Sequence, residues 1–362
     1  MMVLVPLESA SIRPLVGRSE EIDQLAELLG LGAPVPASGA VLIAGDAGVG
    51  KSRLLAELRA RFRDSDWRVL LGHCLDFGDS ALPYLPFTEM FGRLTTDSPA
   101  LAESVAKAHP GVSRLMPGMR RLIDPDEVQA LRVERGDLIE AVHAALEQLA
   151  KAVPLLVVIE DVHWADQSTR EMLSFLLSRQ FVQPVSVVAS YRSDDLHRRH
   201  PLRAAVAEWA RLPGVTRLQL APLSDVDVRT LVQIIHPAPL AELDLHAIVV
   251  RAEGNAFFAE ELVAAAELGR RTLPDDLADL LLVRLDQLDE ASSLAVRATS
   301  VAGRRVSHAL LSRVVDLDDG ALDAALRAAV ERNVLVPVGV DSYAFRHALL
   351  AEAVYDDLLP GE

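Results

Sequence analysis

The stretch GDAGVGKS, which follows AVLIA, fits the pattern G-x-x-x-x-G-K-[S/T]. Gly45, Gly48 and Gly50 would let the backbone approach phosphate oxygens in conformations that a side chain obstructs. The amide groups of such a loop, and the N-terminus of the helix after it, present partial positive charge to an anion. Lys51 would reach the β- and γ-phosphates, and the Ser52 hydroxyl would bind Mg²⁺. The sequence therefore predicts a binding site for the phosphates of a nucleotide.

Two acids, Glu160 and Asp161, end the apolar stretch PLLVVIED. The carboxyl edge of a parallel sheet is where a second Mg²⁺ ligand of a nucleotide site belongs. The first position after such a strand commonly holds Asp and binds the metal through water. Here that position is Glu160, which leaves Asp161 as the candidate for polarising the attacking water. The sequence alone leaves the division of roles between the two acids open.

Two further segments place polar side chains near the end of a strand. VSVVASYR ends at Arg192, which could sense a γ-phosphate or pair at the surface with Asp194 or Asp195. The sequence weights these two interpretations equally. In VHWADQSTREML, either Asp166 or Ser168 can cap the following helix, and a structural role is favoured for Asp166.

The elements that would position these residues alternate along the first part of the chain. Nearly continuous apolar runs predict strands of a parallel sheet covered on both faces. Helical spacing of apolar residues, with Ser19 as the expected N-cap of the first helix, predicts helices between them. We therefore expect an α/β architecture with strands at 40–45, 68–74, 154–161 and 185–192 and helices at 19–30, 51–63 and 134–151.

The composition limits the classes of protein to which the chain could belong. The chain has 362 residues, which is too long for one ordinary domain, and half of them are hydrophobic. Its formal charge of −16, from 36 basic and 52 acidic side chains, argues against broad electrostatic binding to nucleic acid. The single cysteine, Cys74, excludes an internal disulfide and is expected in the core. No apolar run approaches the ~18–20 residues that span a bilayer, and no signal peptide is evident, so we expect a cytoplasmic protein.

The pattern changes after Leu220. From there the sequence is mostly helical, and APLSD reads as a boundary in which Ser224 or Asp225 caps the next helix. A second boundary is expected near Leu273–Pro274. Residues 333–347 predict two short strands around a turn. Helices followed by a small hairpin indicate a winged-helix unit.

With these pieces in place the chain resembles a known family. LVGR, GDAGVGKS, LLVVIEDVHWAD, EGNAFFAEEL and FRHALLAEAVYDDLLP are similar to segments in the nucleotide-binding half of large ATP-binding LuxR-type, MalT-related transcriptional regulators, which belong to the STAND class of signalling ATPases. The resemblance runs from about residue 12 to the end. It implies an α/β P-loop NTPase domain at 1–220, a small helical domain at 221–273 and a winged-helix domain at 274–362.

The resemblance also implies a switch. ADP would hold a closed form, and exchange for ATP would permit opening and self-association, with slow hydrolysis. By the family's pattern Val16 and Arg18 line the adenine side, Arg192 is the sensor arginine, and His347 touches the β-phosphate of ADP. The predicted nucleotide-binding residues are Val16, Arg18, Gly45, Ala47, Gly48, Val49, Gly50, Lys51, Ser52, Arg53 and His347. The predicted catalytic residues are Lys51, Glu160, Asp161 and Arg192, and the predicted Mg²⁺ ligands are Ser52 and Glu160.

Two departures from the family matter. The helical-domain motif usually reads G-N-P, but here Ala256 replaces the proline, which puts its contact near the adenine in doubt. The family's helical-repeat sensor and helix-turn-helix DNA reader are also absent, so we expect a fragment. Inducer or regulatory protein and DNA would then be contacted by missing regions, with no membrane involved.

Three alternatives remain open. The first is an AAA-type motor or remodelling ATPase, which needs an arginine finger from a neighbouring subunit. The second is a DNA reader acting through the winged helix, which the excess of acids over bases in residues 285–362 disfavours. The third is an ATPase module that regulates another effector, such as a cyclase.

Overall fold

The structure is a computed structural model that describes residues 14–33, 38–76, 82–117, 135–198, 200–236, 238–267, 273–303 and 305–359. The chain divides into two units. The first, called the sheet unit below, comprises Arg18–Ala47 and Lys51–Leu220. The second, called the C-terminal unit, comprises Met1–Gly17, Gly48–Gly50 and Ala221–Glu362.

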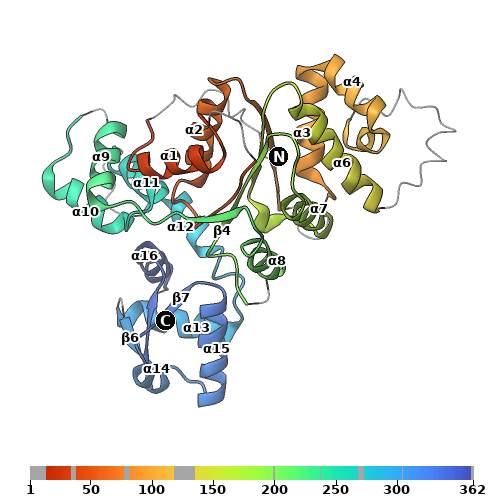
Figure 1. The fold of residues 1–362 in the computed structure, drawn as a ribbon. Coiled ribbons are helices and arrows are strands. Elements are labelled where there is room, and N and C mark those ends of the chain that lie inside the picture. The colour runs from red at the N-terminus through yellow and green to blue at the C-terminus, as the bar shows by residue number, and fades with distance from the viewer. Residues whose placement is uncertain are drawn as a thin grey trace. The chain divides into compact units, whose positions relative to one another are not determined.

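A five-stranded parallel sheet forms the centre of the sheet unit, in the order β2-β3-β4-β1-β5 (Figure 1). The four strands expected from the sequence are confirmed within one or two residues. The fifth, β5, was not predicted, because its half-exposed sequence VTRLQ lacks an apolar run. The bounds are β1 Ala40–Gly45, β2 Arg68–His73, β3 Leu155–Glu160, β4 Val185–Arg192 and β5 Val215–Gln219.

Both faces of the sheet are covered, which explains the continuous apolar runs. Along β3, Leu155, Val157 and Ile159 point to one face and join a hydrophobic core with α6, α7 and α8. Leu156 and Val158 are equally buried on the opposite face, where α1 and α2 pack against the sheet. Because the strands are parallel, the residues at their carboxyl ends are brought to one edge.

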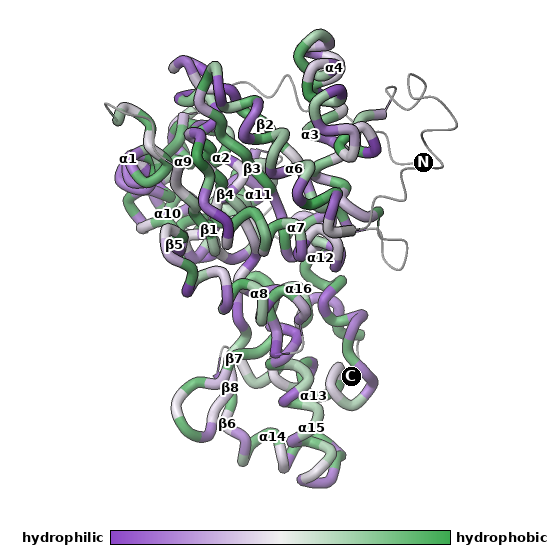
Figure 2. Tube along the Cα trace, turned by 45° about the vertical axis from the view of Figure 1, so that its right-hand side comes forward, coloured by the Kyte–Doolittle hydropathy of each residue, from purple (hydrophilic) through white to green (hydrophobic). Residues whose placement is uncertain are grey.

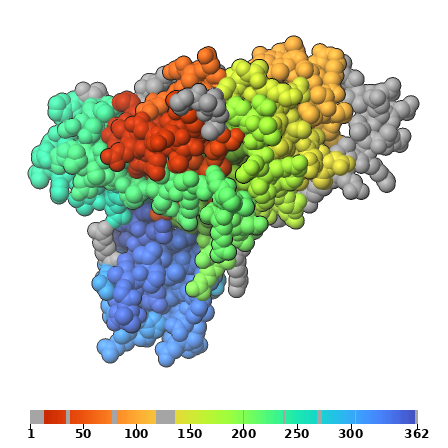
Figure 3. Space-filling view, in the orientation of Figure 1, coloured from red at the N-terminus to blue at the C-terminus, as the bar shows by residue number. Residues whose placement is uncertain are grey.

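The helices of the sheet unit begin and end close to the predicted positions where a prediction was made. One segment, α3 to η1, had no prediction; it packs against α6, as Figure 3 shows in orange beside yellow. The bounds are α1 Ser19–Leu28, α2 Lys51–Arg63, α3 Leu85–Asp97, α4 Pro99–Ala108, η1 Pro110–Leu115, α6 Arg135–Ala150, η3 Val162–Trp164, α7 Gln167–Ser178 and α8 Pro201–Trp209.

The observed N-caps of three helices can be compared with the cap residues predicted from the sequence. Asp166 caps α7 by accepting hydrogen bonds from the backbone N–H groups of Ser168 and Thr169, so the structural role of Asp166 is confirmed. Ser224 caps α9 in the same way. The expected N-cap of α1 was wrong by one residue: the helix begins at Ser19, and Arg18 occupies the cap position without a side-chain hydrogen bond to it.

The C-terminal unit is helical with one small sheet. Its hydrophobic core draws on helices α9 to α16 and on the strands β6–β8. The strands are antiparallel in the order β6-β8-β7, and β7 and β8 confirm the two short strands expected within residues 333–347. The bounds are α9 Asp225–Ile235, α10 Glu242–Ala252, α11 Ala256–Glu267, α12 Asp275–Leu282, α13 Glu290–Ala302, β6 Arg305–Ser307, α14 His308–Val314, α15 Asp319–Glu331, β7 Leu335–Val338, β8 Ser342–Phe345 and α16 Ala348–Asp356.

The hydropathy of the residues along the helices agrees with which faces of the helices are buried. In Figure 2 purple and green residues alternate along the helices, as expected of helices that bury one face. Cys74, just after β2, is buried, and burial raises the pKa of its thiol, so the expected core role is confirmed. Among the described residues no helix is both long and apolar enough to cross a membrane.

Candidate nucleotide-phosphate site

The glycine loop connects β1, which ends at Gly45, to α2, which begins at Lys51. Gly48 and Gly50 adopt φ angles of +79° and +99°, in a region that L side chains rarely enter. A Cβ atom on Gly48 would also lie 2.4 Å from the side-chain oxygen of Asn255. The two glycines are therefore required by backbone conformation, and Gly48 is required by close packing as well.

Lys51 lies buried at the start of α2. Its Nζ atom donates hydrogen bonds of 2.8 Å to the carbonyl oxygens of Gly45 and Asp46. Burial lowers the pKa of the Lys51 ammonium, and the charge of Asp194 is the strongest opposing influence. A buried ammonium hydrogen-bonded to carbonyl oxygens is a good partner for an arriving anion, because phosphate oxygens would supply the compensating negative charge.

Ser52 and Glu160 lie together at the edge of the sheet. A hydrogen bond from Ser52 and the charge of Arg59, whose Nη1 atom is 3.8 Å from Glu160 Oε1, stabilise the carboxylate. Burial nevertheless raises the pKa of Glu160, which is only 5% exposed. A hydroxyl and a carboxylate oxygen are ligands that suit Mg²⁺.

Asp161 differs from Glu160 in its backbone. It adopts φ 58° and ψ 42°, in the left-handed region, and its N–H donates to Ser190 Oγ at 3.2 Å. Its side chain is 26% exposed, whereas that of Glu160 is 6% exposed. The turn thus separates two adjacent acids into a buried one beside Ser52 and a more exposed one.

Arg192 ends β4 and is paired in register with Gly45 at the end of β1. Its guanidinium carbon lies 4.9 Å from the centre of the Trp164 ring, and its Nη1 atom lies 3.8 Å from Asp195 Oδ2. The neighbouring Asp194 instead accepts a 3.1 Å hydrogen bond from the N–H of Ala47 in the glycine loop. The predicted pairing of Arg192 with Asp195 is therefore confirmed. The γ-phosphate sensor role of Arg192 stays a prediction.

Known proteins resemble the part of the chain that contains these residues. Residues 14–188, which contain the glycine loop and both acids, match the family model of an AAA ATPase domain. This part of the chain is therefore similar to AAA ATPase domains. The similarity supports a nucleotide-binding ATPase module, with Mg²⁺ as the usual accompanying ion.

Two solved structures resemble the chain. A Walker-type ATPase of Pyrococcus abyssi aligns with a TM-score of 0.58 at 13% identity, over 94% of this chain and 96% of that one. This likeness supports the parallel-sheet α/β fold of a P-loop NTPase. A STAND protein of Pyrococcus horikoshii with a tetratricopeptide-repeat sensor aligns with a TM-score of 0.44 at 14% identity, over 98% of this chain and 45% of that one, which is too distant to carry an argument.

One curated relative covers most of the chain. An uncharacterized protein of Rhizobium meliloti (strain 1021) is 29% identical over 380 residues, which include 96% of this chain. The chain spans 36% of that relative's length.

The fit of a nucleotide and Mg²⁺ to the ATPase domain can be tested on its side chains. Arg53 Nη2, one residue after Ser52, is buried with no hydrogen-bond partner among the described residues, so it could donate to a ligand. The described residues contain no cluster of three or more His, Cys, Asp or Glu side chains that could hold a metal. Mg²⁺ in NTPases is held by one or two protein oxygens together with phosphates and water, so Ser52 and Glu160 fit this pattern.

The other predicted nucleotide-binding residues fall on both units. Arg18 belongs to the sheet unit, where it is 4% exposed and pairs with Glu21 at 2.8 Å. Val16 packs against the core of the C-terminal unit, and Val49 is buried. His347 occupies the position before α16, with its ring edge-on to Phe258 at 5.5 Å between centroids.

The C-terminal unit holds one part of the glycine loop directly. The N–H of Phe257, in the first turn of α11, donates to the carbonyl of Gly48 at 3.1 Å. The Asn255 side chain that would meet a Cβ on Gly48 accepts hydrogen bonds from the N–H groups of Phe257 and Phe258. Asn255 belongs to the EGNA segment, in which Ala256 replaces the family's proline.

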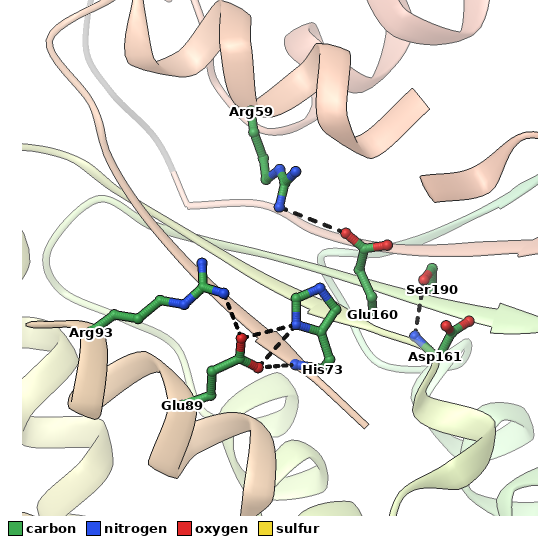
Figure 4. Close-up of polar contacts among 7 residues, drawn as sticks. All are labelled: Arg59, His73, Glu89, Arg93, Glu160, Asp161 and Ser190. Atoms are coloured by element: carbon green, nitrogen blue, oxygen red, sulfur yellow. Dashed lines mark hydrogen bonds and ion pairs between the residues drawn. The ribbon is translucent and has the colours of Figure 1, made fainter. Parts of the chain in front are cut away.

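Sequence reasoning missed a cluster beside Glu160. His73, at the end of β2, is paired in register with Glu160, and Glu89 on α3 bonds both its ring Nδ1 atom, at 2.9 Å, and its backbone N–H (Figure 4). Arg93 in turn donates to Glu89. In the sequence, His73 could be noticed only as a polar residue at the end of a strand. Its carboxylate partner, Glu89, lies on α3, which carries no recognisable motif.

Proposed function

We propose that the chain is the nucleotide-operated switch module of a STAND-class regulator, of the kind found in large ATP-binding LuxR-type transcriptional regulators. One observation carries the proposal: the Gly48 carbonyl accepts a hydrogen bond from Phe257, and the Gly48 backbone packs on Asn255. A change in the loop on nucleotide binding would therefore act directly on the first turn of α11.

The C-terminal unit would supply the moving parts of the switch. We assign residues 221–273 to a helical domain and residues 274–362 to a winged-helix domain. The small antiparallel sheet β6-β8-β7 among helices supports the second assignment. By the resemblance, His347, which precedes α16 and has its ring against Phe258, would touch the β-phosphate of ADP in the closed form.

The residues at the sheet edge would have different roles in binding and hydrolysing ATP. Lys51 would neutralise the β- and γ-phosphates, while Ser52 and Glu160 would hold Mg²⁺, which supplies charge neutralisation when bound. Asp161, the more exposed acid, would orient and deprotonate the attacking water. Arg192 would contact the γ-phosphate and so distinguish ATP from ADP. Hydrolysis would be slow, because a switch needs long-lived states.

The partners follow from the same proposal. The ATP form would self-associate, as the resemblance to the STAND class implies. An inducer or regulatory protein, and DNA through a helix-turn-helix, would be contacted by other parts of a longer cytoplasmic protein. The net charge of −16 supports a module that does not itself bind DNA over a broad surface.

The test uses the purified chain. The protein is denatured, the released nucleotide is identified, and turnover with added Mg·ATP is then measured on a fresh sample. Co-purified ADP with turnover below about one per minute, far under ordinary enzyme rates, would support the switch. An empty site with turnover near one per second or faster would favour an ATP-driven motor instead. Lys51→Ala serves as the control for turnover by contaminating ATPases.

A further inference from the structure

The segment VHWAD, directly after Asp161, contains aromatic side chains to which the proposed function gives no role. The Trp164 ring faces the Arg192 guanidinium, whose central carbon lies 4.9 Å from the ring centre. This distance is within the ~6 Å over which a cation is attracted to an aromatic face. Asp195 adds a carboxylate oxygen 3.8 Å from Arg192 Nη1. Arg192 therefore has two partners that both come from the protein.

His163 supports both of these partners. Its ring lies 4.6 Å from that of Trp164, and its Nε2 atom lies 3.4 Å from Asp195 Oδ2. Burial, together with the charges of Arg192 and Lys51, lowers the pKa of His163 to about 3. The imidazole is therefore neutral at physiological pH, and it buttresses Trp164 and Asp195 without repelling Arg192.

The two acids after Arg192 have different partners. Asp194, 2% exposed, is bound to the glycine loop through the Ala47 N–H, whereas Asp195 faces Arg192 and His163. Asp194 thus anchors the end of β4 beside the loop.

We propose that Trp164 and Asp195 form a resting position for Arg192, from which a γ-phosphate must withdraw it. This inference rests on the proposed role of Arg192 as the γ-phosphate sensor. ADP leaves the guanidinium on Trp164, whereas ATP binds Arg192 only after the resting contacts break. The resting position therefore weakens ATP binding without affecting ADP binding. Contacts of this kind are worth roughly a two- to thirtyfold change in an equilibrium constant.

The test compares dissociation constants for Mg·ATP and Mg·ADP. Trp164→Leu removes the aromatic face and keeps an apolar side chain; Asp195→Asn removes the carboxylate and keeps the shape. Each variant is expected to bind ATP about two- to thirtyfold more tightly, with unchanged ADP affinity. Trp67→Leu is the matched control, because Trp67 packs edge-on to Phe62 and not on Arg192. It should leave the ratio of the two constants at the wild-type value.

Arg192→Ala separates this inference from the function on which it rests. It should lower ATP affinity and leave ADP affinity unchanged. If it does so while Trp164→Leu and Asp195→Asn keep the wild-type ratio, the sensor role stands and the resting position is overturned. If Arg192→Ala changes neither affinity, the sensor role fails and the resting position fails with it. Because Asp195→Asn changes no volume, it decides the question even where Trp164→Leu does not fold.

Discussion

Arg251 on α10 and Glu352 on α16 form a two-point ion pair within the C-terminal unit. Arg251 Nη2 donates to Glu352 Oε1 at 2.6 Å, and Arg251 Nε donates to Glu352 Oε2 at 3.2 Å. Close by, Glu253 accepts a 3.1 Å hydrogen bond from the N–H of Ala348, the first residue of α16. The residue before Ala348 is His347, so this pair and its neighbour hold the proposed ADP-contacting histidine close to the end of α10.

Removing this ion pair should loosen α16. We expect Arg251→Ala or Glu352→Ala to reduce the free energy of unfolding by about 1–2 kcal/mol, since the pair is geometrically good but partly exposed. ADP should also dissociate faster. Denaturant titration and stopped-flow release of a fluorescent ADP would measure the two effects. A double-mutant cycle isolates the pair, and fully additive single effects would contradict a specific interaction.

Lys51→Met should separate nucleotide binding from folding. Burial lowers the pKa of Lys51 and makes its charge costly without a ligand, so an apolar side chain of similar length should leave the stability of the nucleotide-free protein unchanged or raised. Nucleotide affinity should fall roughly a hundredfold or more, because a buried cation opposite phosphate is lost. Calorimetric titration with Mg·ADP measures the affinity. Wild-type affinity would exclude the assigned phosphate site.

Glu160→Gln and Asp161→Asn should have different effects. Glu160, beside Ser52, is the proposed metal ligand, so Glu160→Gln should raise the Mg²⁺ concentration needed for half-maximal binding of ATP. Asp161→Asn should leave binding intact and lower the turnover number by about 10²–10⁴, as expected for loss of a general base. Mg²⁺ titrations and single-turnover assays compare the two variants. If Glu160→Gln instead lowered turnover and Asp161→Asn raised the Mg²⁺ requirement, Asp161 would be the metal ligand and Glu160 the general base.

Gly48→Ala and Gly50→Ala form a matched pair. Both residues have positive φ angles, so each substitution should cost about 1–2 kcal/mol of stability. Only Gly48→Ala introduces a methyl group near another atom, 2.4 Å from Asn255 Oδ1, whereas none lies within 4 Å at Gly50. Gly48→Ala should therefore be the more destabilising. Thermal unfolding measures the difference, and adding Asn255→Ala should reduce the excess; equal costs for the two glycines would refute the contact.

The His73–Glu89 pair should make stability depend on pH. The hydrogen bond that the Glu89 carboxylate accepts from the ring of His73 raises the pKa of His73 above its ordinary 6.5, so this stabilisation is complete below pH 6.5 and is lost as pH rises through the folded-state value. Burial favours protonated Glu89, but the bonds with His73 outweigh it and lower the pKa below the ordinary 4.5. That contribution is present above pH 4.5 and is lost as pH falls through the folded-state value. The pair therefore stabilises most between the two ordinary values.

Glu89→Gln tests this dependence. Its loss of stability relative to wild type should be greatest near pH 5.5 and should shrink towards pH 8.5, as measured by urea unfolding at about these two values. Arg93→Gln is the control: it removes the other partner of Glu89, and its effect should persist at pH 8.5 because a guanidinium stays charged. A pH-independent effect of Glu89→Gln would show that His73 is not charged in the folded protein.

Much of the sheet unit could be predicted from the sequence. The buried strands β1, β3 and β4 are recognisable in the sequence as apolar runs. Glu160 and Arg192 end two of these strands, and Lys51 follows β1 after the glycine loop. Parallel pairing then places those residues at one edge without further information. The half-exposed edge strand β5 escaped prediction, because its packing depends on β1, which lies far away in the sequence.

The glycine loop, the two acids and a phosphate-bearing ligand could be predicted without a structure, because these signals are local and depend on residue type and spacing. The partners of the polar groups were found only in the folded chain: Trp164 for Arg192, Glu89 for His73, Asn255 for Gly48 and Glu352 for Arg251. Most of these pairs join elements that are far apart in the chain. Their contact follows from how helices pack against a sheet or against one another, and spacing along the sequence carries no record of that packing.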